Sequence, residues 1–263
     1  MEPMDDLSDA DLERYARHVI LDEIGEEGQI ALLQSKVCIV GAGGLGSPVL
    51  MYLAGAGIGR IGLVDFDTVD RTNLQRQIAH TEDSVGTSKV ESAAARARAL
   101  NPTIAIDALE TKLDAENIQS VIAPYDLIVD GTDNYAIRIL LNDACFFAKK
   151  PLVSASVVRF EGQLSTFRAY EGGPCYRCVF PEAPADGVVA RCDTAGILGP
   201  VAGVMGTLQA TEVIKQILGL GTGMVGRLML YDALDNDMRM IKTPKNPACP
   251  LCGDKPVIQR PGG

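Results

Sequence analysis

Histidine is scarce in this sequence, and its scarcity excludes several kinds of functional site. The chain has 263 residues, of which only two, His18 and His80, are histidines. Catalytic triads generally use a histidine as the base, and many metal sites are rich in imidazole ligands. We therefore expect neither a histidine-based triad nor a histidine-rich metal site.

Basic residues are also in the minority. There are 24 Lys and Arg against 34 Asp and Glu, which gives a formal net charge of -10 at pH 7. An acidic protein lacks the electrostatic attraction that draws proteins to nucleic acids and to anionic membrane surfaces. We expect no nucleic acid and no membrane among its partners.

The sequence also lacks a long, uninterrupted hydrophobic run. Its most apolar stretch, residues 196–220, contains Gln209, Glu212 and Lys215. A membrane span needs about 20 mostly apolar residues, so we predict a buried helix here. The acidic residues 1–15 have no apolar centre and do not resemble a signal peptide. We expect a cytoplasmic protein, in which cysteines stay reduced and closely spaced pairs indicate metal or redox chemistry.

What the sequence does contain is a regular alternation of strand and helix patterns. Strands are predicted over 36–40, 60–65, 103–109, 125–130 and 151–157, and helices over 88–100, 115–123 and 134–150. This alternation predicts a parallel sheet with helices on both faces. Two helices, over 7–21 with Ser8 as N-cap and over 26–34, precede it.

The pattern changes in the last part of the chain. Residues 161–170, 226–234 and 237–243 alternate in the manner of antiparallel strands, and 171–195 is irregular. We therefore predict an α/β, Rossmann-like doubly wound fold. Its sheet should be mainly parallel, with a few antiparallel strands at the C-terminal end.

A glycine-rich turn, "GAGGLG", follows the first predicted strand, and Ser47 and Pro48 fit the N-cap and first position of a helix after it. Its glycines are Gly41, Gly43, Gly44 and Gly46. Such a turn lets a backbone approach a phosphate at a helix N-terminus. Asp65 ends the next strand and is suited to accept hydrogen bonds from ribose hydroxyls. The alternatives are a packing turn without a ligand and a strand-end cap.

Polar residues beyond Asp65 distinguish this site from a nicotinamide site. Arg76 and Lys89 supply positive charge, which phosphoryl chemistry needs and hydride transfer does not. Asp133 follows another apolar strand, where a carboxylate among phosphates indicates Mg²⁺. Taken separately, Arg76 could be a surface cation, Lys89 a residue at a helix N-terminus, and Asp133 a helix cap. Together they favour a nucleoside triphosphate such as ATP over NAD.

Two C-x-x-C pairs occur far apart in the chain, Cys175 with Cys178 and Cys249 with Cys252. Four thiolates suit tetrahedral Zn²⁺, and we predict a structural zinc site with four cysteine ligands that joins distant segments. Redox-active dithiols are the alternative.

Three further cysteines stand alone. Cys38 and Cys145 lie in apolar segments and are expected in the core. Cys192 follows Arg191 in the irregular segment, a setting that favours a thiolate. A reactive cysteine and an unreactive loop cysteine are both consistent with this position.

Eight segments, in order along nearly the whole chain, resemble the ThiF/MoeB/HesA family of bacterial relatives of ubiquitin-activating enzymes. They are "RYARHVIL", "GAGGLGSP", "VDFDTVDRTNLQRQ", "VGTSKVESA", "DGTDN", "PCYRC", "GILGPVAGVMGTLQATEVIK" and "NPACPLCG". The resemblance implies ATP-dependent adenylation of the C-terminal glycine of a small ubiquitin-like sulfur-carrier protein that ends in Gly-Gly. The adenylate would then accept sulfur as a thiocarboxylate.

The resemblance also assigns roles to residues. It implies that Asp65 holds the ribose, that Asp133 holds Mg²⁺, and that the phosphates are contacted by Asn73, Arg76 and Lys89. Arg17 would reach into the site of a partner subunit, which implies a homodimer. In the ThiF branch, a cysteine at the place of Cys192 can link covalently to the carrier. We expect a single adenylation domain over 1–263, with N-terminal helices in 1–34, the nucleotide-binding core in 35–155, and the carrier-binding and zinc-containing part in 156–263.

Other points stay open at this stage. No sulfurtransferase segment is recognisable, so we expect sulfur from a separate sulfurtransferase or cysteine desulfurase. The carrier could belong to molybdopterin, thiamine, cysteine or tRNA-thiolation metabolism, and the terminal "PGG" is taken as coincidence. The alternative functions are an NAD-dependent oxidoreductase and a non-catalytic binding module for a ubiquitin-like protein.

Overall fold

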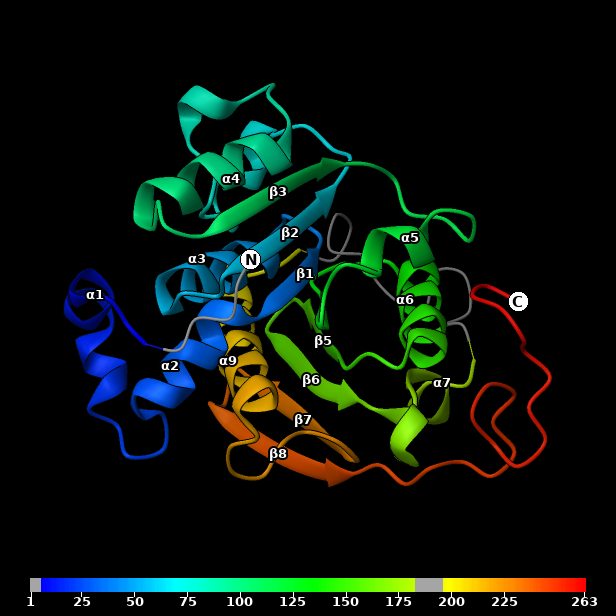
Figure 1. Cartoon of the computed structure of the whole chain (residues 1–263). Coiled ribbons are helices and arrows are strands. Elements are labelled where there is room, and N and C mark those ends of the chain that lie inside the picture. Colours follow the sequence, from blue (N-terminus) through cyan, green and yellow to red (C-terminus); the bar gives the residue numbers. More distant parts are fainter. Residues whose placement is uncertain (1–5, 183–195) are drawn as a thin grey trace.

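The computed structural model describes residues 6–182 and 196–263, and within them eight strands form one twisted sheet (Figure 1). The strand order is β3-β2-β1-β4-β5-β6-β7-β8. The strands are β1 (Lys36–Val40), β2 (Arg60–Asp65), β3 (Ala105–Glu110), β4 (Leu127–Asp130), β5 (Leu152–Val158), β6 (Glu161–Phe167), β7 (Arg227–Asp232) and β8 (Asp237–Lys242). Pairs among β1 to β5 are parallel, and those from β5 to β8 are antiparallel. The predicted fold class is confirmed.

Helices cover both faces of the parallel part (Figure 1). The helices are α1 (Asp9–Val19), α2 (Gly25–Gln34), α3 (Gly46–Ala56), α4 (Lys89–Leu100), α5 (Ile118–Ile122), α6 (Tyr135–Ala148), α7 (Tyr176–Val179) and α9 (Gly199–Leu218). Single 3₁₀ turns lie at η1 (Arg71–Asn73), η2 (Glu82–Ser84) and η3 (Ala169–Glu171). Helices α2, α3, α4 and α9 pack on one face, and α5 and α6 on the other.

In strand β1 the four residues after the exposed Lys36 are all apolar and buried. Val37 and Ile39 belong to the core cluster on the α3 face, whereas Cys38 and Val40 belong to the cluster on the α6 face. Because helices cover both faces of the sheet, consecutive side chains of β1 are buried and a period of two is absent. Cys38 and Cys145 are both buried, as predicted, and burial raises the pKa of Cys38 to about 12.

Helix α9 is the buried helix predicted from the apolar stretch. Its Glu212 is buried, and one of its carboxylate oxygens accepts hydrogen bonds from Thr166 Oγ1 at 2.9 Å and from the Met224 N–H at 2.8 Å. These bonds fasten α9 to β6 and to the loop before β7. Among the described residues, no helix has both the length and the hydrophobicity needed to cross a bilayer.

The two predicted helix starts have different outcomes. Ser8 is the N-cap of α1, with its Oγ accepting the Asp11 N–H at 3.2 Å. The prediction that Ser47 is an N-cap is wrong, because α3 already begins at Gly46. The Ser47 N–H donates to Gly43 O at 2.9 Å, so the glycine turn itself forms the first turn of the helix.

Candidate active site

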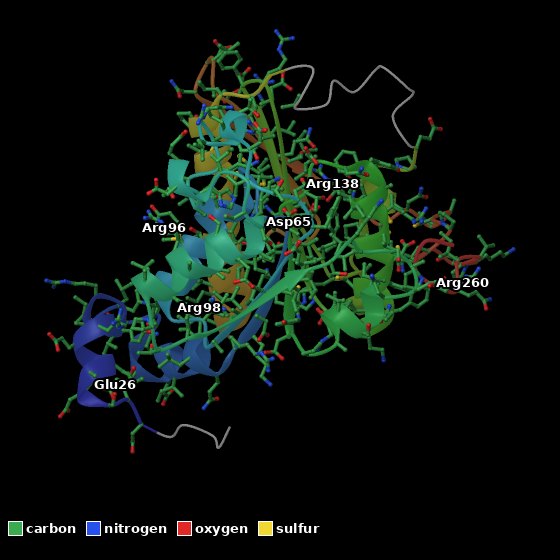
Figure 2. The ribbon with its side chains drawn as sticks, turned by 90° about the horizontal axis from the view of Figure 1, so that it is seen from above. Glu26, Asp65, Arg96, Arg98, Arg138 and Arg260 are labelled. Carbon is green, nitrogen blue, oxygen red and sulfur yellow. The ribbon has the colours of Figure 1, made fainter. Side chains whose placement is uncertain are left out.

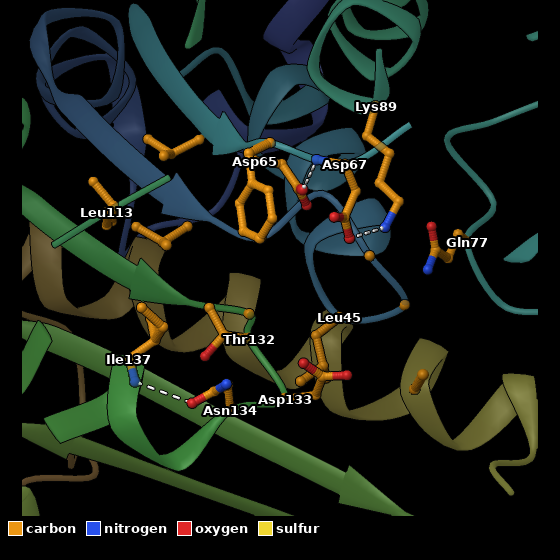
Figure 3. A pocket seen from close by; sticks show the side chains of 18 of the residues that line it. Leu45, Asp65, Asp67, Gln77, Lys89, Leu113, Thr132, Asp133, Asn134 and Ile137 are labelled. Atoms are coloured by element: carbon orange, nitrogen blue, oxygen red, sulfur yellow. Dashed lines mark hydrogen bonds and ion pairs between the residues drawn. The ribbon is translucent and has the colours of Figure 1, made fainter. Parts of the chain in front are cut away.

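A pocket of about 600 Å³ lies at the carboxyl ends of β1, β2 and β4 (Figure 3). The strand order reverses between β1 and β4, and open α/β sheets bind ligands where such a reversal occurs. Figure 2 shows Asp65 and Arg138 in the central part of the molecule, with Glu26 and Arg260 at opposite ends. The predicted site residues that line this pocket are Gly41, Gly43, Gly44, Asp65, Arg76, Lys89 and Asp133.

Glycines of the turn line the pocket, and two positions of the turn admit only glycine. Gly41 has φ +97°, and a Cβ there would lie 2.8 Å from Gly131 O. A Cβ on Gly46 would lie 1.8 Å from Gly41 O. Gly46 does not line the pocket; its hydrogen atom allows the turn to close against the start of α3.

Asp65 is held by backbone N–H groups at the end of β2. Its Oδ2 accepts from the Ala42 N–H at 2.8 Å, and its Oδ1 accepts from the Asp67 N–H at 3.0 Å. A carboxylate has about four lone-pair positions, so two bonds leave capacity for ribose hydroxyls. The residue is therefore oriented toward the glycine turn and still able to bind a ligand.

Two of the predicted cations reach the pocket from different segments. Lys89 is the first residue of α4 and is buried, with its Nζ donating to Asp67 Oδ2 at 3.0 Å (Figure 3). Arg76 follows η1, and its Nη1 donates to Thr72 O at 3.0 Å. Lys89 is thus the first residue of a helix, which was the alternative interpretation of this residue, and it also lines the pocket.

Asp133 enters the pocket from the segment after β4, opposite Lys89 (Figure 3). The N-cap of α6 is Asn134, whose Oδ1 accepts the Ala136 N–H at 2.9 Å. The alternative interpretation of Asp133 as a helix cap is therefore wrong. Its exposed carboxylate is an oxygen ligand suited to Mg²⁺.

A buried ion pair holds the segment that carries Asp133. Asp130 Oδ1 accepts from Thr132 N–H at 3.0 Å, and its Oδ2 accepts from Ser154 Oγ at 2.6 Å. Arg138 Nε lies 3.7 Å from Asp130 Oδ2, and its Nη2 donates to Thr132 O. Burial is the largest single influence on Arg138 and lowers its pKa, but Asp130, Tyr176 and Asp133 together outweigh burial, so the pKa is raised. The contacts of Asp130 and Arg138 with Thr132 fix the residue that directly precedes Asp133.

Some predicted residues lie elsewhere. The Asn73 side chain is not part of the pocket lining; its Oδ1 accepts the Asp70 N–H at 3.1 Å in a capping box. Arg17 is exposed on α1, away from the pocket of its own chain. Cys192 lies outside the described residues.

The pocket also contains residues to which the sequence assigned no role. They are chiefly Phe66, Asp67, Gln77, Thr111, Lys112, Leu113 and Asn134. Phe66 and Asp67 directly follow Asp65, and Gln77 directly follows Arg76. Their closeness in sequence to these predicted site residues is the signal that could have placed them in the pocket. The residues 111–113 reach the pocket only because β3 pairs with β2, which no local pattern reveals.

The four cysteines of the two C-x-x-C pairs come together. Cys175 and Cys178 lie at the start of α7 and within it, and Figure 1 shows α7 near the C-terminal loop. The Sγ atoms of all four cysteines lie within 4.8 Å of one another. The contacts between pairs are 3.5 Å for Cys175 with Cys249 and 3.4 Å for Cys178 with Cys252. Zinc bonded to four sulfurs at about 2.3 Å places them about 3.8 Å apart. A hydrogen bond from the Cys175 thiol lowers the pKa of Cys252 to about 5. The same hydrogen bond raises the pKa of Cys175, and burial raises the pKa of Cys178. A metal ion bound by the four cysteines would favour their thiolate forms.

The segment around these cysteines contains structure where an irregular region was predicted. The short helix α7 places Arg177, which donates to both carboxylate oxygens of the buried Asp143 at 2.9 and 2.8 Å. The Gly262 N–H also donates to Asp143, at 3.2 Å. Helix α6 therefore anchors both segments that carry the cysteine pairs.

A Rossmann-like sheet with a glycine turn, two cations and two carboxylates in one pocket at its switch point defines a nucleotide-using α/β enzyme. Residues 15–251 match the model of the ThiF family, and the chain belongs to that family.

Similar proteins agree with this membership. The chain is 49% identical over 243 residues to "SAMP-activating enzyme E1" of Haloferax volcanii, covering 92% of this chain and 89% of that protein. It is 45% identical to "Sulfur carrier protein adenylyltransferase" of Thermus thermophilus, covering 94% and 93%. It is 48% identical to "Adenylyltransferase and sulfurtransferase MOCS3" of Anopheles gambiae, where it spans 97% of this chain and 58% of that protein.

A solved structure has the same fold. The crystal structure of Escherichia coli MccB with MccA-N7isoASN superposes with a TM-score of 0.81 at 25% identity, covering 91% of this chain and 74% of that one.

Proposed function

We propose that this protein uses ATP to adenylate the C-terminal glycine of a ubiquitin-like sulfur-carrier protein. The observation that carries the proposal is the joint placement of Asp65, Arg76, Lys89 and Asp133 in one pocket at the switch point of the sheet. Two relatives of nearly the same length, at 45% and 49% identity, carry names that describe this chemistry.

The reaction follows from the charges in the pocket. The carrier's terminal carboxylate attacks the α-phosphorus of ATP, an acyl–phosphate bond forms, and the bond to pyrophosphate breaks. Negative charge increases on the departing phosphates, and Arg76 and Lys89 stabilise it. Lys89 can exchange its bond to Asp67 for a phosphate oxygen, since both are anionic acceptors at the same ammonium group.

Asp133 is the residue that we propose to hold Mg²⁺. It is an exposed carboxylate that lies across the pocket from Lys89 (Figure 3), and Mg²⁺ in nucleotide sites is bound by one or two carboxylates together with phosphate oxygens. When bound, the ion neutralises phosphate charge. The Asp130–Arg138 pair keeps Asp133 in place for this role.

Pyrophosphate exchange tests the proposal. Incubation with Mg-ATP, labelled pyrophosphate and a Gly-Gly-ended carrier of the source organism should produce labelled ATP. A carrier without its last glycine is the matched control and should produce none. No exchange with any such carrier would contradict the proposal, and nicotinamide-dependent turnover would favour the oxidoreductase alternative.

We further propose that the protein acts as a homodimer in which Arg17 completes the partner's pocket. Arg17 is exposed and does not line the pocket of its own chain. Close to it, at the end of the same helix and in the loop after it, Ile20 and Leu21 are 68% and 46% exposed. Apolar groups exposed together are typical of a protein interface.

A separate sulfurtransferase or cysteine desulfurase would deliver sulfur to the adenylate that this protein forms.

The cysteine cluster is proposed as a structural Zn²⁺ site. Freshly purified protein should contain one zinc per chain by elemental analysis. Because the metal joins segments 74 positions apart, a strong chelator should lower the melting temperature by about 5 °C or more. Cys252→Ser should lose the zinc, whereas Cys145→Ala, which removes a buried thiol outside the cluster, should keep it. Wild-type protein with much less than one zinc per chain would contradict this assignment.

A further inference from the structure

The second histidine, His80, is buried beside the pocket without lining it, and both of its ring nitrogens have partners. Its Nε2 lies 3.0 Å from Ala42 O, and its Nδ1 lies 3.0 Å from Ser92 Oγ. Ala42 belongs to the glycine turn, and Ser92 is on α4, one turn after Lys89. His80 therefore connects two elements that line the pocket, the glycine turn and α4.

Through the contact with His80, both backbone polar groups of Ala42 have side-chain partners. The Ala42 N–H donates to Asp65 Oδ2 at 2.8 Å, and its carbonyl is held by His80. The backbone N–H of His80 donates to Gln77 O at 3.1 Å, at the end of the segment that contains Arg76. One residue thus joins the glycine turn, the Arg76 segment and the helix of Lys89.

The partners of His80 also define its protonation. A carbonyl oxygen only accepts, so Nε2 carries the proton and Nδ1 accepts from the Ser92 hydroxyl. Burial lowers the pKa of His80; the Ala42 carbonyl opposes this effect, and the charge of Lys89 adds to it. The ring is therefore neutral near pH 7, and the tautomer is defined by its two partners.

We infer that His80 is a positioning residue that holds the glycine turn, the Arg76 segment and α4 in the arrangement that receives a triphosphate. The inference rests on the proposed function for the identity of the ligand. It assigns His80 no contact with the nucleotide: the residue acts through Ala42 and Ser92.

Two substitutions separate the contacts of the ring. In His80→Gln the amide nitrogen takes the place of Nε2 and can still donate to Ala42 O. In His80→Asn the shorter amide reaches only the place of Nδ1, and Ala42 O loses its donor. Loss of the donor to a buried acceptor is expected to raise the dissociation constant for Mg-ATP about tenfold in His80→Asn. His80→Gln should remain within about twofold of wild type.

Calorimetric titration with Mg-ATP and with adenosine, which has no phosphates, measures these effects. Adenosine binding and the KM for the carrier should not change in either variant. ATP binding by His80→Asn at the wild-type level would overturn the inference, and so would an equal loss of ATP and adenosine binding, which general damage to the fold would cause. Absence of pyrophosphate exchange in wild-type protein would contradict the proposed function instead and would leave this binding comparison valid.

A measurement on the unaltered protein keeps the inference testable if His80→Asn does not fold. ¹⁵N NMR of the ring should show a neutral, Nε2-protonated His80 at pH 7, and a His18→Gln variant assigns the remaining signal. An Nδ1-protonated or rapidly exchanging ring would overturn the inference.

Discussion

Arg76→Ala should lower the rate of carrier adenylation by about two orders of magnitude or more, with a smaller loss of ATP affinity. The guanidinium group lies in the pocket with its Nη1 bonded to Thr72 O, so it is oriented before a ligand arrives. A preorganised cation stabilises charge that develops in the transition state more than charge already present in bound ATP, and removal of such a group typically costs this factor. Single-turnover adenylation and ATP titration measure the two effects separately.

Arg71→Ala is the matched control for this experiment. Arg71 lies five residues earlier in the same segment, but its side chain is 76% exposed and pairs with Glu82 on the surface. Arg71→Ala removes the same charge as Arg76→Ala, at a position close to Arg76 in the sequence. Losing the exposed Arg71–Glu82 ion pair should change stability little. Arg71→Ala should adenylate at nearly the wild-type rate. If both variants lose activity equally, net charge and not the position of Arg76 is responsible.

The second large effect concerns the sharing of sites between subunits. Arg17→Ala and Asp133→Ala should each abolish most activity on their own. If Arg17 serves the partner's pocket, a mixed dimer has one site with both residues intact. Random pairing of equal amounts makes half of the dimers mixed, each with one active site, so about a quarter of wild-type activity should return.

The controls for this mixture use the same helix. Arg14, on the same helix as Arg17, donates to Leu100 O of its own chain, so Arg14→Ala should remain active alone. Subunit exchange is verified by native mass spectrometry with one variant isotopically labelled. Exchange without any return of activity would show that Arg17 does not act across the interface.

Local sequence signals predicted the elements whose cause is local. The alternation of strand and helix patterns predicted a parallel sheet with helices on both faces, and Ser8 marked the start of α1 because its bonds span only three residues. The glycine turn and Asp65 were predictable for the same reason: their positions follow from one strand–turn–helix unit. The prediction for Ser47 was wrong because this favourable N-cap residue lies one position inside a helix that the glycine turn had already begun.

Other features depend on contacts between segments far apart in the chain. Cys175 and Cys249 meet at 3.5 Å across 74 positions, and the sequence supplied only their types and spacing within each pair. The Asp130–Ser154 hydrogen bond spans 24 positions and the His80–Ala42 contact spans 38, and neither follows a periodic pattern.

The sequence by itself determined the class of fold, the glycine turn and most of the charged residues that line the pocket, because helix and strand periodicity and short motifs are encoded within a few neighbouring residues. Only the tertiary structure decided how the segment of Asp133 is held and that His80 connects the glycine turn with α4 beside the pocket. The pairing order of the strands brings these side chains together, and that order is set by the packing of the whole sheet against its two helical layers.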